Sequence, residues 1–149
     1  MGMPSDLGII DTMVGFPSPD RSQVYKFIQP HLRDEESKSF TMPAAYMFKD
    51  IPGEIAEGVD AVAVTLDNMD RYGVDKGLIN VGSTVREEPR RAIRAHPDRF
   101  LGMVDVDPRE GMDAVRKIRQ YHDEYGIVAV SSFPARYMTP INAAAYYPV

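Results

Sequence analysis

The sequence predicts an α/β fold built from parallel β/α units. Four short, almost continuously apolar segments alternate with helical patterns, and helices between strands indicate a parallel sheet because parallel neighbours need crossover connections. Strands that are apolar on both faces are typical of a sheet covered on both sides. These observations leave open a small doubly wound sheet and part of an eight-stranded barrel. The predicted strands lie at residues 7–17, 77–81, 100–106 and 127–133.

The longest helical pattern runs from Glu54 to Tyr72. Its apolar side chains recur every three or four residues, which is the spacing of one helix face. Gly73 is expected to end this helix as a left-handed cap. The apolar stripe consists of Ile55, Val59, Val62, Leu66 and Met69.

Two later helices carry explicit start signals. The first begins either with a capping box at residues 84–87 or with Pro89 in its first turn. For the second, Asp107 as N-cap and Pro108 at the first helical position predict the start, and Gly126 predicts the end. The buried stripe of this second helix is expected to be Met112, Val115, Ile118 and Tyr121.

A modest helical pattern places Val24, Phe27 and Ile28 on one face before Pro30 ends it. The other segments are expected to be irregular parts of one domain spanning residues 1–149. Residues 33–39 read as a charged, solvated loop, and residues 40–52 add three large apolar side chains between prolines. This loop insertion, at about residues 33–53, either packs over the rim of the fold or forms a lid or protein contact. Residues 135–149 show no regular pattern.

Composition and charge exclude several classes of function. With 44% hydrophobic and 26% charged residues, the chain has the composition of an ordinary globular protein. A formal net charge of -5 argues against nucleic-acid binding, and no apolar run is long enough to span a bilayer. The absence of cysteine excludes disulfides and thiolate chemistry, and the amino terminus lacks the pattern of a signal peptide. We therefore expect a cytoplasmic location and no membrane partner.

Five short motifs occur in order along the chain. They are Ile10-Asp11, Met69-Asp70-Arg71-Tyr72-Gly73-Val74-Asp75-Lys76, His96-Pro97-Asp98-Arg99-Phe100, Val104-Asp105-Val106-Asp107-Pro108 and Tyr146-Tyr147-Pro148. Together they resemble the amidohydrolase-related proteins, metal-dependent TIM barrels, and in particular their branch similar to aminocarboxymuconate-semialdehyde decarboxylase. The resemblance covers nearly the whole chain and favours the barrel over the doubly wound sheet.

The resemblance implies that the chain is the amino-terminal half of such a barrel. A complete barrel needs roughly 250 residues, whereas this chain has 149. The chain is then either a fragment or a short form completed by another polypeptide, because a half-barrel alone exposes a sheet edge that invites pairing. The expected partners are the remaining half of the barrel or another protein in a homo- or hetero-oligomer, together with a small-molecule ligand.

The resemblance also identifies a chemical conflict in the first strand. Members of this family begin with Ile-Asp-x-His-x-His, and the two histidines hold the catalytic metal. Met13 and Gly15 stand at those positions here. A thioether does not replace imidazole as a ligand for zinc, and glycine has no side chain. The three histidines lack useful spacing and are explained as surface or capping residues, so a divalent metal such as zinc would need ligands from the missing half.

Pocket candidates follow from the rule that such barrels place active sites at the carboxyl ends of their strands. Asp11, Met13 and Gly15 alternate along the first strand and are expected to point together into the barrel. Asp11 also fits a structural carboxylate that binds backbone amides, and Asp105 fits a pocket or a structural role equally well. The candidates are Asp11, Met13, Gly15, Asn80, Asp105, Ser131 and Ser132.

Two functions remain open. The first is a nominal metal-dependent hydrolase or decarboxylase that acts on a small organic acid or amide and whose first-strand metal histidines are replaced. The second is a non-catalytic amidohydrolase-like scaffold, a binding or assembly protein for a partner enzyme. A serine nucleophile at Ser131 or Ser132 is disfavoured, because the sequence lacks the Gly-x-Ser-x-Gly turn.

Overall fold

The structure of the chain is a computed structural model that describes residues 7–18, 30, 32–39, 55–82 and 86–149. The chain divides into two compact units, one of residues 1–16 and 60–149 and the other of residues 17–59. The larger unit contains every strand described below.

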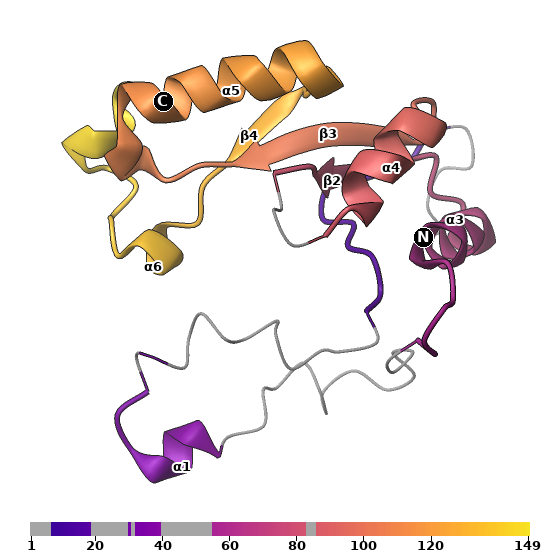
Figure 1. Cartoon of the computed structure of the whole chain (residues 1–149), viewed down its shortest axis with the longest axis horizontal. Coiled ribbons are helices and arrows are strands. Elements are labelled where there is room, and N and C mark those ends of the chain that lie inside the picture. The colour runs from indigo at the N-terminus through magenta and orange to yellow at the C-terminus, as the bar shows by residue number, and fades with distance from the viewer. Residues whose placement is uncertain (1–6, 19–29, 31, 40–54, 83–85) are drawn as a thin grey trace. The chain divides into compact units, whose positions relative to one another are not determined.

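Four parallel strands form one sheet in the order β1-β2-β3-β4, and this sheet is a curled half-barrel (Figure 1). The sequence prediction of an α/β fold with about half of a barrel is therefore confirmed. The strands are β1 (Ile10–Asp11), β2 (Lys76–Asn80), β3 (Phe100–Asp105) and β4 (Ala129–Ser131). The helices between them are α3 (Ala61–Tyr72), α4 (Glu88–Ala95) and α5 (Met112–Tyr125).

One face of the sheet is covered by helices and holds the core. Side chains on β2 and β3 alternate between buried and half-buried, and the largest fully buried ones include Ile79, Phe100 and Val104. Gly102 belongs to this face, and a Cβ atom added there would lie 2.8 Å from Cδ1 of Ile93 in α4. The opposite, open face carries the half-buried side chains Leu78, Asn80, Leu101, Met103 and Asp105.

Helix α3 begins later than its apolar pattern predicts. Gly58 adopts a φ of 84°, and Asp60 acts as the N-cap by accepting a hydrogen bond from the Val62 amide at 3.0 Å. The helix ends at Gly73, which has the predicted left-handed conformation with a φ of 69°. The carboxyl end of α3 was thus predicted correctly and its amino end was not.

The start of α5 also differs from the prediction. Asp107 caps a short 3-10 helix, η2 (Pro108–Glu110), by accepting the Arg109 amide at 2.9 Å. Gly111, with a φ of 52°, separates η2 from α5, so the helix begins one turn after the predicted start. Gly126 ends α5 as predicted, and it adopts the left-handed conformation.

Pro89 lies in the first turn of α4, and the N-cap residue Glu87 makes no side-chain capping hydrogen bond. This observation agrees with the proline start among the two alternatives. The capping box at residues 84–87 lies partly outside the described residues.

Strand β1 is much shorter than the predicted segment because the chain turns immediately after it. Asp11 Oδ1 accepts a hydrogen bond from the Met13 amide at 2.9 Å, which closes a turn. Val14 then packs against Gly77, where an added Cβ would meet Val14 Cγ2 at 2.8 Å. Farther along, Phe16 is buried with its ring centroid 5.7 Å from that of Phe100.

Segments predicted to be irregular contain short helices. In the smaller unit, α1 (Glu35–Lys38) forms where a charged loop was predicted, and Asp34 caps it. Near the carboxyl terminus lie α6 (Pro134–Tyr137) and a 3-10 helix, η3 (Ala144–Tyr146). The helical pattern at Val24, Phe27 and Ile28 and the apolar insertion at residues 40–52 lie outside the described residues. No helix in the described ranges has the length and hydropathy needed to cross a bilayer.

Candidate functional site

Asp105 is the centre of a polar group at the carboxyl ends of β3 and β4. Its Oδ1 accepts a hydrogen bond from the Ser131 hydroxyl at 3.3 Å, and its Oδ2 accepts one from the Tyr137 hydroxyl at 2.7 Å. Arg136 Nη1 lies 3.7 Å from the same Oδ2. Because Asp105 and Ser131 are register partners on adjacent strands, the sheet itself brings them together. We call Asp105, Ser131, Arg136 and Tyr137 the carboxyl-edge cluster.

The cluster is partly shielded from solvent. The Asp105 side chain is 18% exposed and the Arg136 side chain is 55% exposed. Burial, followed by the hydrogen bond to the Asp105 carboxylate, raises the pKa of Tyr137 above its usual value. Tyr137 therefore remains a neutral hydrogen-bond donor at physiological pH and holds α6 against the end of β3.

Cationic side chains surround this edge. Lys117 Nζ donates a hydrogen bond to the Asp105 carbonyl oxygen at 3.3 Å, and Arg109 lies over the Tyr137 ring with 5.8 Å between Cζ and the ring centroid. Arg109 also pairs with Asp107, and its side-chain hydrogen bond holds the pKa of that carboxyl below its usual value. The edge therefore combines acceptor oxygens with positive charge, which suits a polar or anionic ligand.

Asn80 and Ser132 have different surroundings. Asn80 lies on the open face in register with Met103, which precedes Asp105 by two residues on β3. The Oδ1 atom of Asn80 accepts a hydrogen bond from the Gly82 amide at 2.8 Å. The Ser132 hydroxyl lies 3.1 Å from the hydroxyl of Tyr146 in η3. The structure thus unites Asp105 with Ser131, keeps Asn80 on the same face, and links Ser132 to the carboxyl-terminal segment.

The serine hydroxyls do not form a nucleophile-base pair with a histidine in the described part of the chain. Ser131 hydrogen-bonds a carboxylate and Ser132 hydrogen-bonds a phenol. A serine nucleophile needs a base that in turn is oriented by a third group. In the described residues, each hydroxyl therefore has a hydrogen-bond partner other than a histidine.

The orientation expected for Asp11, Met13 and Gly15 is wrong in the structure. Asp11 pairs in register with Gly77, which belongs to the helix-covered face, and not with the open-face residues of β2. Met13 lies in the turn after β1 and is 88% exposed, while an added Cβ at Gly15 would meet nothing within 4 Å. Asp11 therefore lies on the helix-covered face, and because β1 ends at Asp11, strand alternation does not extend to Met13 and Gly15.

These residues instead border a hollow on the helix-covered side of the sheet. Asp11 and Met13 lie there opposite Asn68 and Tyr72 of α3. Asp11 Oδ1 binds a backbone amide, which matches the structural alternative stated for it. We call this hollow, with Asp11, Met13, Asn68 and Tyr72, the β1 hollow.

The donor set expected of a catalytic metal centre is not assembled in the described residues. They contain no group of three or more histidine, cysteine, aspartate or glutamate side chains placed to hold a metal ion. His96 caps α4 and makes an edge contact with Phe100, with 6.5 Å between ring centroids, and His122 Nδ1 lies 3.6 Å from Asp123 Oδ1. His31 lies outside the described residues. The described residues therefore do not fit a resident divalent metal.

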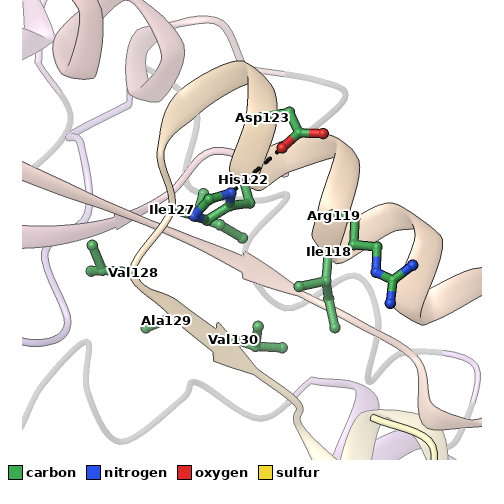
Figure 2. A pocket seen from close by; sticks show the side chains of 8 residues that line it. All are labelled: Ile118, Arg119, His122, Asp123, Ile127, Val128, Ala129 and Val130. Carbon is green, nitrogen blue, oxygen red and sulfur yellow. Dashed lines mark ion pairs between the residues drawn. The ribbon is translucent and has the colours of Figure 1, made fainter.

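A groove of about 400 Å³ opens between α5 and β4, which is an edge strand of the sheet among the described residues (Figure 2). Val128 and Val130 are 63% and 43% exposed there. Ile118, Arg119 and His122 of α5 line the opposite wall. We call this cavity the β4 groove.

Sequence reasoning missed Arg136, Tyr137 and Lys117 as members of the polar edge. Arg136 and Tyr137 follow β4 within a segment that shows no periodic pattern, and Lys117 belongs to the amphipathic helix α5. Their contacts with Asp105 span 12 to 32 residues. The sequence offered one clue, which is that a tyrosine and an arginine follow the predicted carboxyl end of a strand.

The comparisons with known proteins add no relative from which to transfer a role. No family model, no curated protein and no solved structure matches this chain significantly. The fold and site geometry therefore carry the functional argument alone.

Proposed function

We propose that this chain is an amidohydrolase-related half-barrel that acts as a binding and assembly component and does not carry out metal-dependent catalysis by itself. The observation that supports this proposal is that the Asp105 carboxylate is already occupied by hydrogen bonds and an ion pair. Its Oδ1 accepts a hydrogen bond from Ser131, while Tyr137 donates to its Oδ2 and Arg136 pairs with the same oxygen. A carboxylate held in this way orients neighbouring groups and is a poor candidate for a metal ligand or general base.

The ligand class follows from the chemistry of the carboxyl edge. Arg136 is partly exposed beside Asp105, and Asn80 adds an amide on the same open face. Guanidinium and amide groups recognise carboxylates and amides through directed hydrogen bonds. A small organic acid or amide is therefore the proposed ligand, and a complementary half of the barrel or another protein is the proposed partner.

A second candidate is a hydrolase or decarboxylase that acts on the same ligand class. It is favoured by the position of the carboxyl-edge cluster, since enzymes with this architecture build their sites at the carboxyl ends of the strands. In that case the metal ligands would come from outside the described residues, which provide no such group. We also propose a cytoplasmic location, which is compatible with a chain that has no cysteine.

Metal analysis and calorimetry distinguish the two candidates. The purified full chain, dialysed against zinc and then against buffer, should retain well under one zinc ion per chain. It should bind simple dicarboxylates weakly, and Arg136→Gln should weaken that binding about tenfold, as expected from the loss of about 1.4 kcal/mol. One tightly held zinc ion per chain would contradict the binding role, and equal binding by the variant would contradict the proposed ligand site.

A further inference from the structure

The two edge strands of the sheet carry complementary surfaces. In this four-stranded sheet the edge strands are β1 and β4, and both expose apolar side chains. Ile10 on β1 is 54% exposed, and the valines beside the β4 groove are also open to solvent. Unpaired strand edges of this kind are templates for pairing with another chain. Because every pairing in the sheet is parallel, a strand with the direction of β1 fits the free edge of β4.

The β4 groove and the β1 hollow lie on the same side of the sheet. Val130 is in register with Val104, which is fully buried on the helix-covered face, and Asp11 is in register with Gly77 of that face. Pairing β4 of one copy with β1 of another would therefore place the groove beside the hollow. The exposed Met13 would then lie next to the apolar wall of the groove, and a flexible thioether side chain adapts readily to such a surface.

Charge also favours this pairing. Arg119 and His122 line the β4 groove, whereas Asp11 borders the β1 hollow. Asp123 in the groove already lies beside His122, with 3.6 Å between Oδ1 and Nδ1. Arg119 is thus the cation in the groove that faces the carboxylate brought by a second copy.

We infer that two copies of this chain associate through β4 of each copy and β1 of the other. This inference rests on the proposed function and deepens it by naming a second copy as the partner. The contact between unlike edges occurs twice about a two-fold axis, so no edge remains free. The resulting eight parallel strands form a closed barrel. Side chains can fill the interior of a barrel with eight strands. Leu78, Leu101 and Met103 of both copies then share one interior.

The same symmetry completes the ligand site. Both carboxyl-edge clusters lie at the carboxyl ends of parallel strands, so the dimer gathers them around one opening of the barrel. The four strands of one copy supply one side of that opening.

Light scattering on the full chain tests the association. The expected mass is twice the 16.7 kDa of one chain. Met13→Asp and Val130→Asp should each give monomers, because each variant places a charge at one edge of the pair. A matched control, Met112→Asp, alters a methionine that is 55% exposed and lines neither the β4 groove nor the β1 hollow, so it should leave the dimer intact. Far-UV circular dichroism of every variant reports whether the fold is retained.

Mixing the two edge variants gives the sharpest result. A Met13→Asp chain keeps an intact β4 edge and a Val130→Asp chain keeps an intact β1 edge, so an equimolar mixture should form a heterodimer through one seam. Arg119→Glu should weaken the dimer and Asp11→Arg in the same chain should restore it. A monomeric parent chain, an open series of larger species, or dimers that survive both edge variants would overturn the inference. A monomer that still binds dicarboxylates through Arg136 would leave the proposed binding function standing.

Discussion

Replacing Tyr137 by phenylalanine removes one hydroxyl and leaves the ring in place. The hydroxyl donates to Asp105 Oδ2 at 2.7 Å, and hydrogen bonds to charged acceptors contribute about 1.5–3 kcal/mol. Because the Asp105 side chain is 18% exposed, water replaces part of this interaction. We expect Tyr137→Phe to lower the free energy of unfolding by about 1–2 kcal/mol at pH 7, measured by urea titration.

The alkaline pH dependence provides an independent check of the same contact. Burial and the bond to Asp105 raise the pKa of Tyr137 in the folded chain, whereas the unfolded side chain ionises near 10. The tyrosine therefore stabilises the fold fully below about pH 10, and this contribution is lost as the pH rises through the folded pKa. The difference between parent and variant should be constant from pH 7 to 9 and shrink above about pH 10.

The control for this experiment is Tyr147→Phe, which alters a tyrosine that is 88% exposed. Its effect should lie within about 0.5 kcal/mol of zero. If Tyr137→Phe changes the free energy of unfolding as little as this control at every pH, the hydrogen bond does not hold α6 to the sheet. The conclusion that Tyr137 occupies the Asp105 carboxylate is then contradicted.

Three further predictions concern packing, capping and acid stability. Gly102→Ala should lower the free energy of unfolding by about 1–3 kcal/mol, measured by urea titration, because the added Cβ crowds two isoleucine side chains, whereas Gly15→Ala should change it by under about 0.5 kcal/mol. Gly73→Ala should lower the thermal midpoint through a cost of about 1–2 kcal/mol, since Gly73 has a φ of 69°, and an unchanged midpoint would contradict the left-handed cap. Arg109 lowers the pKa of Asp107, so this carboxylate stabilises the fold above its unfolded pKa near 4 and loses that effect as the pH falls. Acid titration of Asp107→Asn should therefore show a smaller loss of stability below pH 4 than the parent chain shows.

Features encoded by neighbouring residues could be predicted from the sequence. Gly73 and Gly126 end their helices as expected, because glycine after an amphipathic run takes the left-handed conformation at little cost. The parallel sheet followed from the strict alternation of strands and helices. These inferences use a few adjacent positions and one general rule of chain connection.

The boundaries of helices and strands were less predictable where a nearby cap or turn ends the regular backbone conformation. The apolar stripe extends back to Ile55, but Gly58 and the Asp60 cap start α3 at Ala61. In the first strand, the turn closed by Asp11 ends β1, so strand alternation does not extend to Met13 and Gly15. Side-chain competition with the backbone decided both boundaries.

The composition of the carboxyl-edge cluster could be predicted only in part. Asp105 and Ser131 follow strand ends, so the sequence identified them and the register unites them. Tyr137 and Arg136 reach Asp105 through a short helix that has no periodic signature. Contacts of that kind depend on the path of the chain between the elements, which composition and spacing do not encode.

Cross-linking tests the parallel order of the strands most directly, because the chain has no cysteine of its own. Leu78 is in register with Leu101, and Asn80 is in register with Met103. Neighbouring strands lie about 4.8 Å apart, within reach of a disulfide. The double variants Leu78→Cys with Leu101→Cys and Asn80→Cys with Met103→Cys should both oxidise within one chain. If the second pair stays reduced while Asn80→Cys with Arg99→Cys forms the bond, the strands run antiparallel, and the half-barrel and its carboxyl-edge site are contradicted.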